Sequence, residues 1–335
     1  GCSSMTTPTL TEPISELSPP VRFPLPDDLQ AALDRPADRV TLSDGRTLSY
    51  RDSGDPSGTP ILWFHGTPSC RMEGVMLDEP GRRFHMRFLA LDRPGIGQSD
   101  PHPGWSMLDH IHDAVQLADR LGLERFGVMG GSGGGPFVLA AALACPERLT
   151  CAVSLACAGA FELPELRAHI GLVDRIAAWS IAHSPLAVRT YFAGLRLGSR
   201  LSPTTAHTLG RWMPGMVPGR VPAIAPLGVV LMREMLRQGD AGGAADAAVL
   251  HNPWGFELTQ IRAPVDFYQG TRDEFIPVAY STTLASLVPQ SRLILCEGDD
   301  HFATIYDLDR IVRRSGERFA VLRSDAVERH RWRPV

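Results

Sequence analysis

Short, wholly apolar runs alternate with helix-like segments over most of this chain, and this alternation limits the possible folds more than any other feature of the sequence. A strand that is apolar at every position is buried on both faces, which is typical of parallel strands connected by helices. Strands are expected at 61–64, 88–91, 126–129, 150–155, 265–268 and 293–295. Helices are expected at about 71–85, 106–121, 133–145, 277–288 and 303–315. The sequence therefore predicts an α/β protein.

Several stretches depart from this alternation and set the expected boundaries. Residues 1–37 are rich in proline and are predicted to form an arm, whereas the period-two pattern at 39–51 predicts an antiparallel hairpin. Residues 158–250 contain Leu, Ala, Met and Arg at helical spacing and predict a helical insertion over one end of the sheet. Residues 317–335 are predicted to be an Arg-rich, solvated tail. The α/β core is then expected to comprise 38–157 and 251–316.

The composition excludes several classes of function. All 33 basic residues are arginine, so no lysine is present for a Walker A phosphate site, a pyridoxal-phosphate Schiff base or a general base. A net charge of -4 argues against nucleic acid as a partner and favours a small-molecule ligand. His110, His112 and Asp113 resemble metal ligands, but side chains two apart on a helix face different sides. We therefore expect no metal and no cofactor.

The expected location is the cytoplasm, and no membrane association is expected. The longest apolar runs are far shorter than the roughly 20 residues of a spanning helix, and no two cysteines form a C-x-x-C pair. Residues 1–4 resemble the junction of a lipoprotein signal, but no basic or apolar region precedes them, so we expect an addition ahead of Met5. Nothing in the sequence indicates the oligomeric state.

The strongest local signal is Gly-Gly-Ser-Gly-Gly at 130–134, between an expected strand and an expected helix. A serine on such a turn adopts a strained backbone conformation, and glycines two residues to either side avoid collisions with the strand and the helix. The Ser132 hydroxyl would then project from the carboxyl edge of the sheet. The same pattern also fits a glycine-rich phosphate-binding turn, so the turn alone leaves both interpretations open.

Two further residues match what a serine nucleophile requires, namely a base and a carboxylate that orients it. Asp273 and His301 each follow an expected strand. The order Ser132, Asp273, His301 differs from the orders in chymotrypsin and subtilisin and is that of the α/β hydrolases. The alternatives for the carboxylate are Asp299, Asp300 and Glu274. Asp273 is favoured because side chains immediately next to the base usually point elsewhere.

These motifs make the chain similar to the α/β-hydrolase superfamily over about residues 38–316. The motifs are His-Gly-Thr-Pro at 65–68, Asp-Arg-Pro-Gly-Ile-Gly-Gln-Ser at 92–99, the serine turn, and the pair Asp273 and His301. The resemblance implies an eight-stranded, mostly parallel sheet with helices on both faces, capped by the 158–250 insertion. It also implies that the backbone amides of Thr67 and Gly133 form an oxyanion hole.

The resemblance suggests roles for other residues near the site. Asp92 is expected to shape a tight turn, and His65 to hold the oxyanion loop or to contact substrate. Large side chains of the cap are candidates for a substrate lining, although packing within the cap is the favoured explanation for them. They are Trp179, Trp212, Met213 and Met232.

The expected function is that of a serine hydrolase which cleaves a carboxylic ester, lactone or thioester of an apolar small molecule through an acyl-enzyme. An epoxide hydrolase or haloalkane dehalogenase would have Asp as its nucleophile at position 132, so Ser132 disfavours both. A carbon-carbon hydrolase, a cofactor-free haloperoxidase and, in another class, a ligand-binding receptor or scaffold on the same fold remain open.

The principal alternative is an aminopeptidase similar to proline iminopeptidases. Those enzymes share Gly-Gly-Ser, but their pattern has Trp where this chain has Gly133. Such an enzyme would also need carboxylates in the cap for the substrate amine. The candidates are Glu162, Glu165 and Asp174.

Overall fold

The computed structural model describes residues 9–10, 29–166, 169–200 and 225–314, and its centre is a nine-stranded sheet of order β1-β9-β8-β7-β6-β4-β5-β3-β2. The strands are β1 (Thr9–Leu10), β2 (Asp38–Thr41), β3 (Thr47–Gly54), β4 (Thr59–Phe64), β5 (Met86–Leu91), β6 (Phe126–Gly131), β7 (Leu149–Leu155), β8 (Val265–Gly270) and β9 (Ser291–Cys296). The pairs β2·β3 and β3·β5 are antiparallel, and the other pairs are parallel. The predicted eight-stranded sheet is confirmed as β2–β9, with β1 added at one edge.

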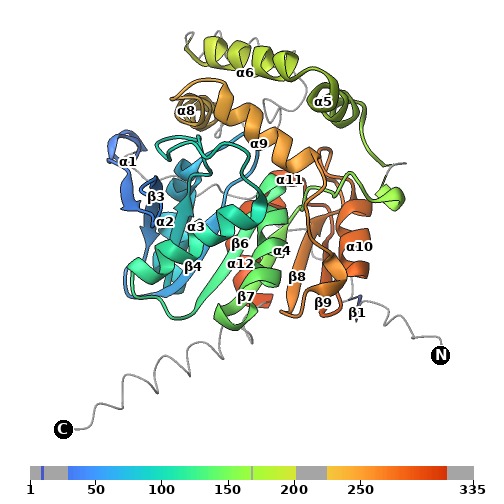
Figure 1. Cartoon of the computed structure of the whole chain (residues 1–335). Helices are drawn as coiled ribbons and strands as arrows, with labels where there is room; N and C mark the ends of the chain where they lie inside the picture. Colours follow the sequence, from blue (N-terminus) through green and yellow to red (C-terminus); the bar gives the residue numbers. More distant parts are fainter. Residues whose placement is uncertain (1–8, 11–28, 167–168, 201–224, 315–335) are drawn as a thin grey trace.

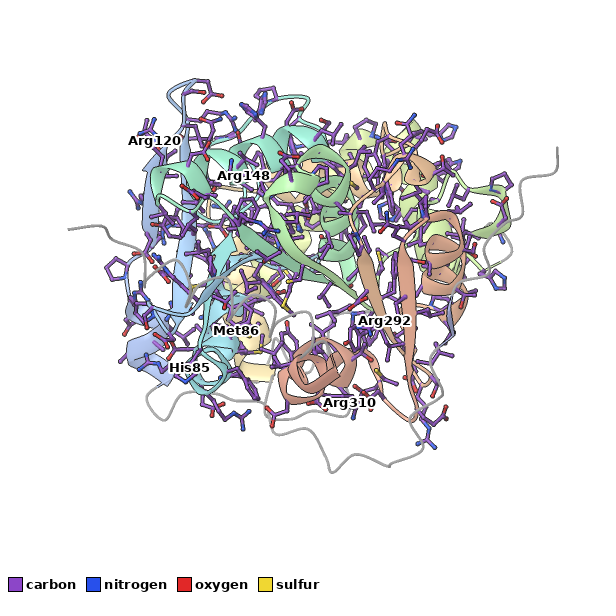
Figure 2. The ribbon with its side chains drawn as sticks, turned by 90° about the horizontal axis from the view of Figure 1, so that it is seen from below. His85, Met86, Arg120, Arg148, Arg292 and Arg310 are labelled. Atoms are coloured by element: carbon purple, nitrogen blue, oxygen red, sulfur yellow. The ribbon has the colours of Figure 1, made fainter. Side chains whose placement is uncertain are left out.

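Helices cover both faces of this sheet, as its continuous apolar strands predict. One buried apolar cluster packs α3 (Met107–Arg120), α4 (Gly135–Ala144) and α10 (Val278–Leu287) on the first face. A second cluster packs α2 (Gly74–Phe84), α11 (His301–Tyr306) and α12 (Leu308–Arg314) on the other face. Figure 2, seen from below, shows Arg148 and Arg310 on opposite sides of the sheet.

The last predicted helix, 303–315, is wrong in its bounds, because two short helices occupy this stretch. The first, α11, begins at His301, since the Asp300 carboxylate accepts a hydrogen bond from the amide of Ala303 and caps that end. It ends before Asp307, whose backbone leaves the helical region at φ -79 and ψ 68. Asp307 then accepts from the amide of Arg310 and starts α12. A polar side chain that competes for backbone amides therefore divides the predicted helix.

Four described helices lie between β7 and β8, in the predicted helical insertion (residues 158–250), which we call the insertion; the last of them ends one residue later, at His251. They are α5 (Leu172–His183), α6 (Pro185–Arg200), α8 (Ala225–Met235) and α9 (Ala241–His251). Figure 1 shows them together above one end of the sheet. Apolar side chains of α6, α8 and α9 form a buried cluster with Cys70, Met72 and Ile96 of the core. The insertion is thus packed onto the core through a shared apolar contact.

The remaining described segments are short. The first helix, α1 (Leu29–Asp34), precedes β2, and the predicted hairpin is β2 with β3. Most of the predicted arm and the whole predicted tail 317–335 lie outside the described residues. Among the helices that the structure describes, none has the length and apolar content needed to traverse a bilayer.

Candidate active site

Ser132 occupies a sharp turn between β6 and α4. Its φ is +55°, in the left-handed region that side chains other than glycine rarely adopt. The preceding strand ends at Gly131, and a 3-10 turn at Ser132–Gly134 leads into α4. This is the strained turn that the sequence predicts, and it leaves the serine residue half-buried.

The glycines around Ser132 are required by close backbone contacts. A Cβ atom at Gly130 would lie 2.5 Å from the carbonyl oxygen of Gly134. At Gly134 a Cβ would lie 2.0 Å from the carbonyl oxygen of Phe64 on the neighbouring strand. These contacts confirm the prediction that side chains two residues from the serine would collide with the strand and the helix.

Asp273 and His301 are joined by a hydrogen bond of 2.8 Å between Oδ2 and Nδ1. Asp273 follows β8 and His301 follows β9, and these two parallel strands are neighbours in the sheet. Because β6 runs parallel to both, with only β7 between, Ser132 lies at the same carboxyl edge. The side chain of Asp273 is fully buried, and that of His301 is 8% exposed.

Helix α11 brings His301 close to the serine turn. A Cβ atom at Gly131, directly before Ser132, would lie 2.7 Å from the side chain of Ile305. Ile305 is four residues after His301 on the same helix. The helix that begins with the candidate base therefore packs directly against the turn that carries the candidate nucleophile.

The Asp273 carboxylate is held by four hydrogen bonds. Besides the contact with His301, Oδ1 accepts from the amides of Phe275 and Ile276 at 2.9 and 2.8 Å. Oδ2 also accepts from Nε2 of Gln269 at 3.2 Å. Such a carboxylate cannot rotate away from the histidine without losing several partners at once.

Sequence reasoning missed Gln269, which is fully buried at the end of β8. Its Nε2 also donates to the carbonyl oxygens of Gly270 and Ile276, and its Oε1 accepts from Oγ of Ser281. The signal was a lone amide side chain in an otherwise apolar strand end, directly before the loop that carries Asp273.

The other acids considered as partners of the base are engaged elsewhere or exposed. Asp299 pairs with Arg310, and Asp300 caps α11. Burial raises the pKa of Asp299, and Arg310 offsets part of that effect. Glu274 is exposed. Of these carboxylates, Asp273 is the one bonded to His301.

The loop 65–67 lies beside the serine turn. A Cβ atom at Gly66 would lie 3.6 Å from Cβ of Ser132, and one at Gly133 would lie 2.7 Å from Oγ1 of Thr67. The structure therefore brings together the two residues, Thr67 and Gly133, whose amides are the predicted oxyanion donors. The same missing Cβ at Gly133 would lie 3.1 Å from Leu250 of α9.

Arg93 and Asp246 form a buried ion pair behind this loop. Nε of Arg93 donates to Oδ1 of Asp246 at 2.5 Å, and the two side chains are 1% and 0% exposed. Arg93 also donates to the carbonyl oxygens of His65 and Gly66 at 2.6 and 2.9 Å. Oδ2 of Asp246 accepts from Oγ1 of Thr67 at 2.8 Å. An acid of the insertion thus contacts the loop directly and through Arg93.

Sequence reasoning also missed this pair and Glu73, which binds the same loop. Glu73 accepts from the amide of Gly66 at 3.0 Å and from Nε1 of Trp63 at 2.7 Å. Burial raises the pKa of Glu73, although its hydrogen bonds favour the charged form. The signal for Asp246 was a single acid in a helix of Ala and Gly.

His65 and Asp92 have the structural contacts that the family resemblance suggests. Nδ1 of His65 lies 2.7 Å from the carbonyl oxygen of Gly66, and burial, with nearby Arg93, lowers the pKa of His65 well below its usual value. Asp92 is fully buried and accepts from Ser49 and from Arg71. Both side chains hold loops at this edge of the sheet.

The histidines of α3 do not form a metal site. His110 is buried, His112 is exposed, and Asp113 pairs with Arg46. Burial lowers the pKa of His110 to about 3. Within the described ranges no group of three or more His, Cys, Asp or Glu side chains could hold a metal ion.

The predicted lining residues of the insertion have different environments. Met232 is buried in the apolar cluster shared with the core. Trp179 is 60% exposed on α5 and stacks on His183 with ring centroids 5.2 Å apart. Trp212 and Met213 lie outside the described residues. A substrate-lining role for any of these residues stays a prediction.

A cavity of about 700 Å³ lies between the insertion and the core, away from Ser132. Seven arginines line it, among them Arg71, whose guanidinium pairs with Asp92 and with Glu234 of α8. Since Ser132, Asp273 and His301 are not among the lining residues, we do not assign the reaction to this cavity.

Comparisons with known proteins agree with this architecture. A family profile described as alpha/beta hydrolase fold matches residues 59–192. An esterase from Exiguobacterium antarcticum superposes with a TM-score of 0.61 and 18% identity, covering 83% of this chain and 97% of that chain. The chain has the α/β-hydrolase fold. An enol-lactonase from Burkholderia xenovorans LB400 shares this fold with a TM-score of 0.58 and 18% identity, covering 84% of this chain and 100% of that chain. The fold that the sequence resemblance implies is confirmed.

Relatives by sequence match a smaller part of this α/β-hydrolase-fold chain. A proline iminopeptidase from Xylella fastidiosa (strain 9a5c) is 33% identical over 118 residues, which are 33% of this chain and 36% of that protein. One from Arabidopsis thaliana is 31% identical over 118 residues, which are 33% of this chain and 30% of that protein. The chain thus spans about a third of the length of the curated relatives it matches.

Proposed function

We propose that this protein is a serine hydrolase that cleaves a carboxylic ester, lactone or thioester of an apolar small molecule through an acyl-enzyme. The observation that carries the proposal is the hydrogen-bonded pair of Asp273 and His301 at the sheet edge where Ser132 has a φ of +55°. Nδ1 of His301 is occupied by Asp273, which leaves Nε2 to accept the proton of the Ser132 hydroxyl.

The reaction then proceeds in two stages. As His301 takes the proton, Oγ of Ser132 attacks the carbonyl carbon, and His301 returns the proton to the leaving alcohol or thiol when the carbon-oxygen or carbon-sulfur bond breaks. In the second stage His301 takes a proton from a water whose oxygen attacks the acyl carbon, and it returns this proton to Oγ of Ser132 as the bond to the acyl group breaks and the acid leaves. The amides of Thr67 and Gly133 stabilise the negative oxygen in both stages.

The preference for an apolar substrate rests on the side chains around the site. Leu250 of α9 approaches Gly133, and the Phe275 ring lies 5.3 Å from the His301 ring, with 39% of Phe275 exposed. We propose that the insertion acts as a cap whose α9 side faces the acyl group. An esterase and an enol-lactonase among the structural neighbours support this class of substrate.

The test is reaction with a fluorophosphonate probe, followed by kcat/KM for p-nitrophenyl esters of increasing chain length. We expect labelling of the wild type but not of Ser132→Ala, and kcat/KM that rises several-fold from acetate to butyrate or hexanoate, because a buried methylene contributes about 0.8 kcal/mol. Equal labelling of both proteins, or a preference for acetate over every longer ester, would contradict the proposal.

A second candidate is an aminopeptidase, because the relatives by sequence are named proline iminopeptidases. Glu162 offers a specific observation in its favour. Its Oε1 accepts from the amide of Trp254, whereas its Oε2 is buried and has no hydrogen-bond partner among the described atoms. A buried carboxylate oxygen of this kind can receive a substrate ammonium group.

Against the second candidate, Gly133 stands where the aminopeptidase pattern has Trp, and Thr67 and Leu250 occupy the space beside it. Cleavage of prolyl p-nitroanilide distinguishes the two candidates. Rapid cleavage that is lost in Glu162→Gln would favour the aminopeptidase, whereas ester cleavage that is unaffected by Glu162→Gln would favour the esterase.

A further inference from the structure

We infer that Asp246 of the insertion and Arg93 of the core are positioning residues that fix the direction of the Thr67 amide, so that a seated insertion completes the oxyanion hole. This inference rests on the proposed function. It adds two residues and gives the insertion a role in the chemistry.

The peptide unit between Gly66 and Thr67 carries the Thr67 amide and is held from its other side. This planar unit contains the carbonyl group of Gly66 and the N–H group of Thr67, which point in opposite directions. Any group that fixes the carbonyl therefore also fixes the direction of the N–H. Nη2 of Arg93 donates to the Gly66 oxygen at 2.9 Å, and Nδ1 of His65 lies 2.7 Å from the same oxygen.

Asp246 holds the two ends of this arrangement. It accepts two hydrogen bonds from Arg93, at 2.5 Å from Nε and at 3.0 Å from Nη2, which sets the position of the guanidinium. Its Oδ2 also accepts from Oγ1 of Thr67 at 2.8 Å, which sets the side chain of the residue that supplies the amide. The Thr67 hydroxyl in turn accepts from Arg93 at 2.6 Å.

The network is dry and therefore stiff. Arg93 is 1% exposed and Asp246 is 0% exposed, so water cannot replace any of these contacts without opening the structure. Asp246 lies on α9, whose Leu250 also approaches Gly133, the other predicted donor. The same insertion helix thus touches both predicted oxyanion donors.

This geometry predicts a specific kinetic signature. Hydrogen-bond donors stabilise a tetrahedral intermediate only where they point at the oxygen that becomes negative, and a small displacement reduces that effect more than it reduces substrate binding. Loosening the network should therefore lower kcat and the affinity for a tetrahedral mimic, with little change in KM. A role confined to folding would lower stability without this pattern.

The first test uses Thr67→Val, which keeps the shape and the backbone amide but removes the hydroxyl that binds Asp246. With p-nitrophenyl butyrate we expect kcat about tenfold lower and KM within about twofold of wild type. The affinity for an alkyl boronic acid, which forms a tetrahedral adduct with the serine, should fall in parallel. Thr67→Ser, which restores the hydroxyl, should recover most of both losses.

The second test uses Asp246→Asn, with Asp113→Asn as its matched control. Asp113 is also a buried acid paired with an arginine, Arg46, but it lies on α3. We expect both variants to lose thermal stability, and only Asp246→Asn to lose kcat and boronate affinity. If Asp246→Asn does not fold, Thr67→Val decides alone, because it leaves the ion pair intact.

The outcomes separate the two proposals. A wild type that reacts with neither a fluorophosphonate nor a boronic acid overturns the proposed function and, with it, the positioning role. A wild type that reacts, together with a folded Thr67→Val that keeps wild-type kcat and boronate affinity, overturns the positioning role alone. An equal loss of kcat in Asp113→Asn would also overturn it.

Discussion

The two sides of Ser132 differ in what holds them. On the side of the proposed base, the described contacts that support Asp273 and His301 come from the core, through Gln269 and the amides that follow Asp273. On the side of the loop, residues 65–67 are held by Glu73 of the core and by Asp246 of the insertion. A movement of the insertion would therefore leave the base in place and disturb the loop.

The same contrast appears between two described arginines of the core, Arg93 and Arg71, that pair with acids of the insertion. Arg93 pairs with Asp246 in a dry contact, whereas Arg71 pairs with Glu234, which is 16% exposed at the wall of the arginine-lined cavity. Arg71 also keeps a second acid, Asp92, within the core. Losing the insertion's acid should therefore cost much more at Arg93 than at Arg71.

The largest expected effect tests the side that the core supports. Asp273→Asn should lower kcat by about 10⁴, because the amide favours the wrong tautomer of His301. The urea concentration at the unfolding midpoint should stay close to the wild-type value, although kcat falls by this large factor. A residual rate above a tenth of wild type would mean that another carboxylate orients His301, and Asp300→Asn would then be the variant to measure.

The second prediction tests the buried contact between Arg93 of the core and Asp246 of the insertion, which we call the dry junction. Asp246→Ala should lower the free energy of unfolding by roughly 3–5 kcal/mol, since it leaves the Arg93 charge buried without its partner. Urea denaturation measures this change. The double variant Arg93→Met with Asp246→Leu should recover most of the stability but not the rate, because it removes the unpaired charge and also the groups that hold the loop.

The third prediction is that buried His110 makes the protein less stable in acid. His110 packs against Phe64, two residues before Gly66, and burial lowers the pKa of His110 to about 3. In the unfolded chain this histidine binds a proton near pH 6.5, whereas in the folded chain it stays neutral until about pH 3. The free energy of unfolding of the protein therefore falls as the pH falls from about 6.5 towards 3.

Replacement of this histidine should remove that loss. His110→Phe should gain up to about 1.4 kcal/mol relative to wild type for each pH unit below 6.5, as measured by urea unfolding at pH 7, 6 and 5. His112→Phe, on the exposed side of the same helix, serves as the control. Parallel pH profiles for His110→Phe and wild type would contradict the assignment.

The smallest expected effect is at the contact between Arg71 and Glu234, which we call the wet junction because Glu234 is partly exposed. Burial alone would raise the pKa of Glu234, but Arg71, together with Gln98 and Arg237, outweighs burial and holds this pKa below its usual value. Since Arg71 retains Asp92, Glu234→Gln should cost less than about 1 kcal/mol of stability. A loss as large as that of Asp246→Ala would remove the distinction between the two junctions.

The parts of the site that could be predicted from sequence are those that local chemistry determines. The glycines around Ser132 are required by contacts within one turn or with the adjacent strand. Asp273 and His301 each follow a buried strand, and parallel strands bring their carboxyl ends to one edge whatever the length of chain between them. The strands of the sheet were predictable because each is marked by its own continuous apolar run.

The parts that could not be predicted depend on contacts between distant segments. Arg93 and Asp246 are 153 residues apart, and nothing in either local sequence specifies the other. The sequence of the 65–68 motif indicates a role for the backbone amide of Thr67 only, whereas the Thr67 hydroxyl is engaged by both members of this pair. The packing of the insertion on the core decides these contacts, and periodicity does not encode that packing.

The short strand β1 has a consequence for handling the protein. Thr9 and Leu10 pair with Arg292 and Leu293, so these two residues cover part of the outer edge of β9. An uncovered strand edge presents free N–H and C=O groups to other chains and invites edge-to-edge association. A variant truncated beyond Leu10 would expose that edge. We expect such a variant to aggregate on storage, while its kcat stays unchanged.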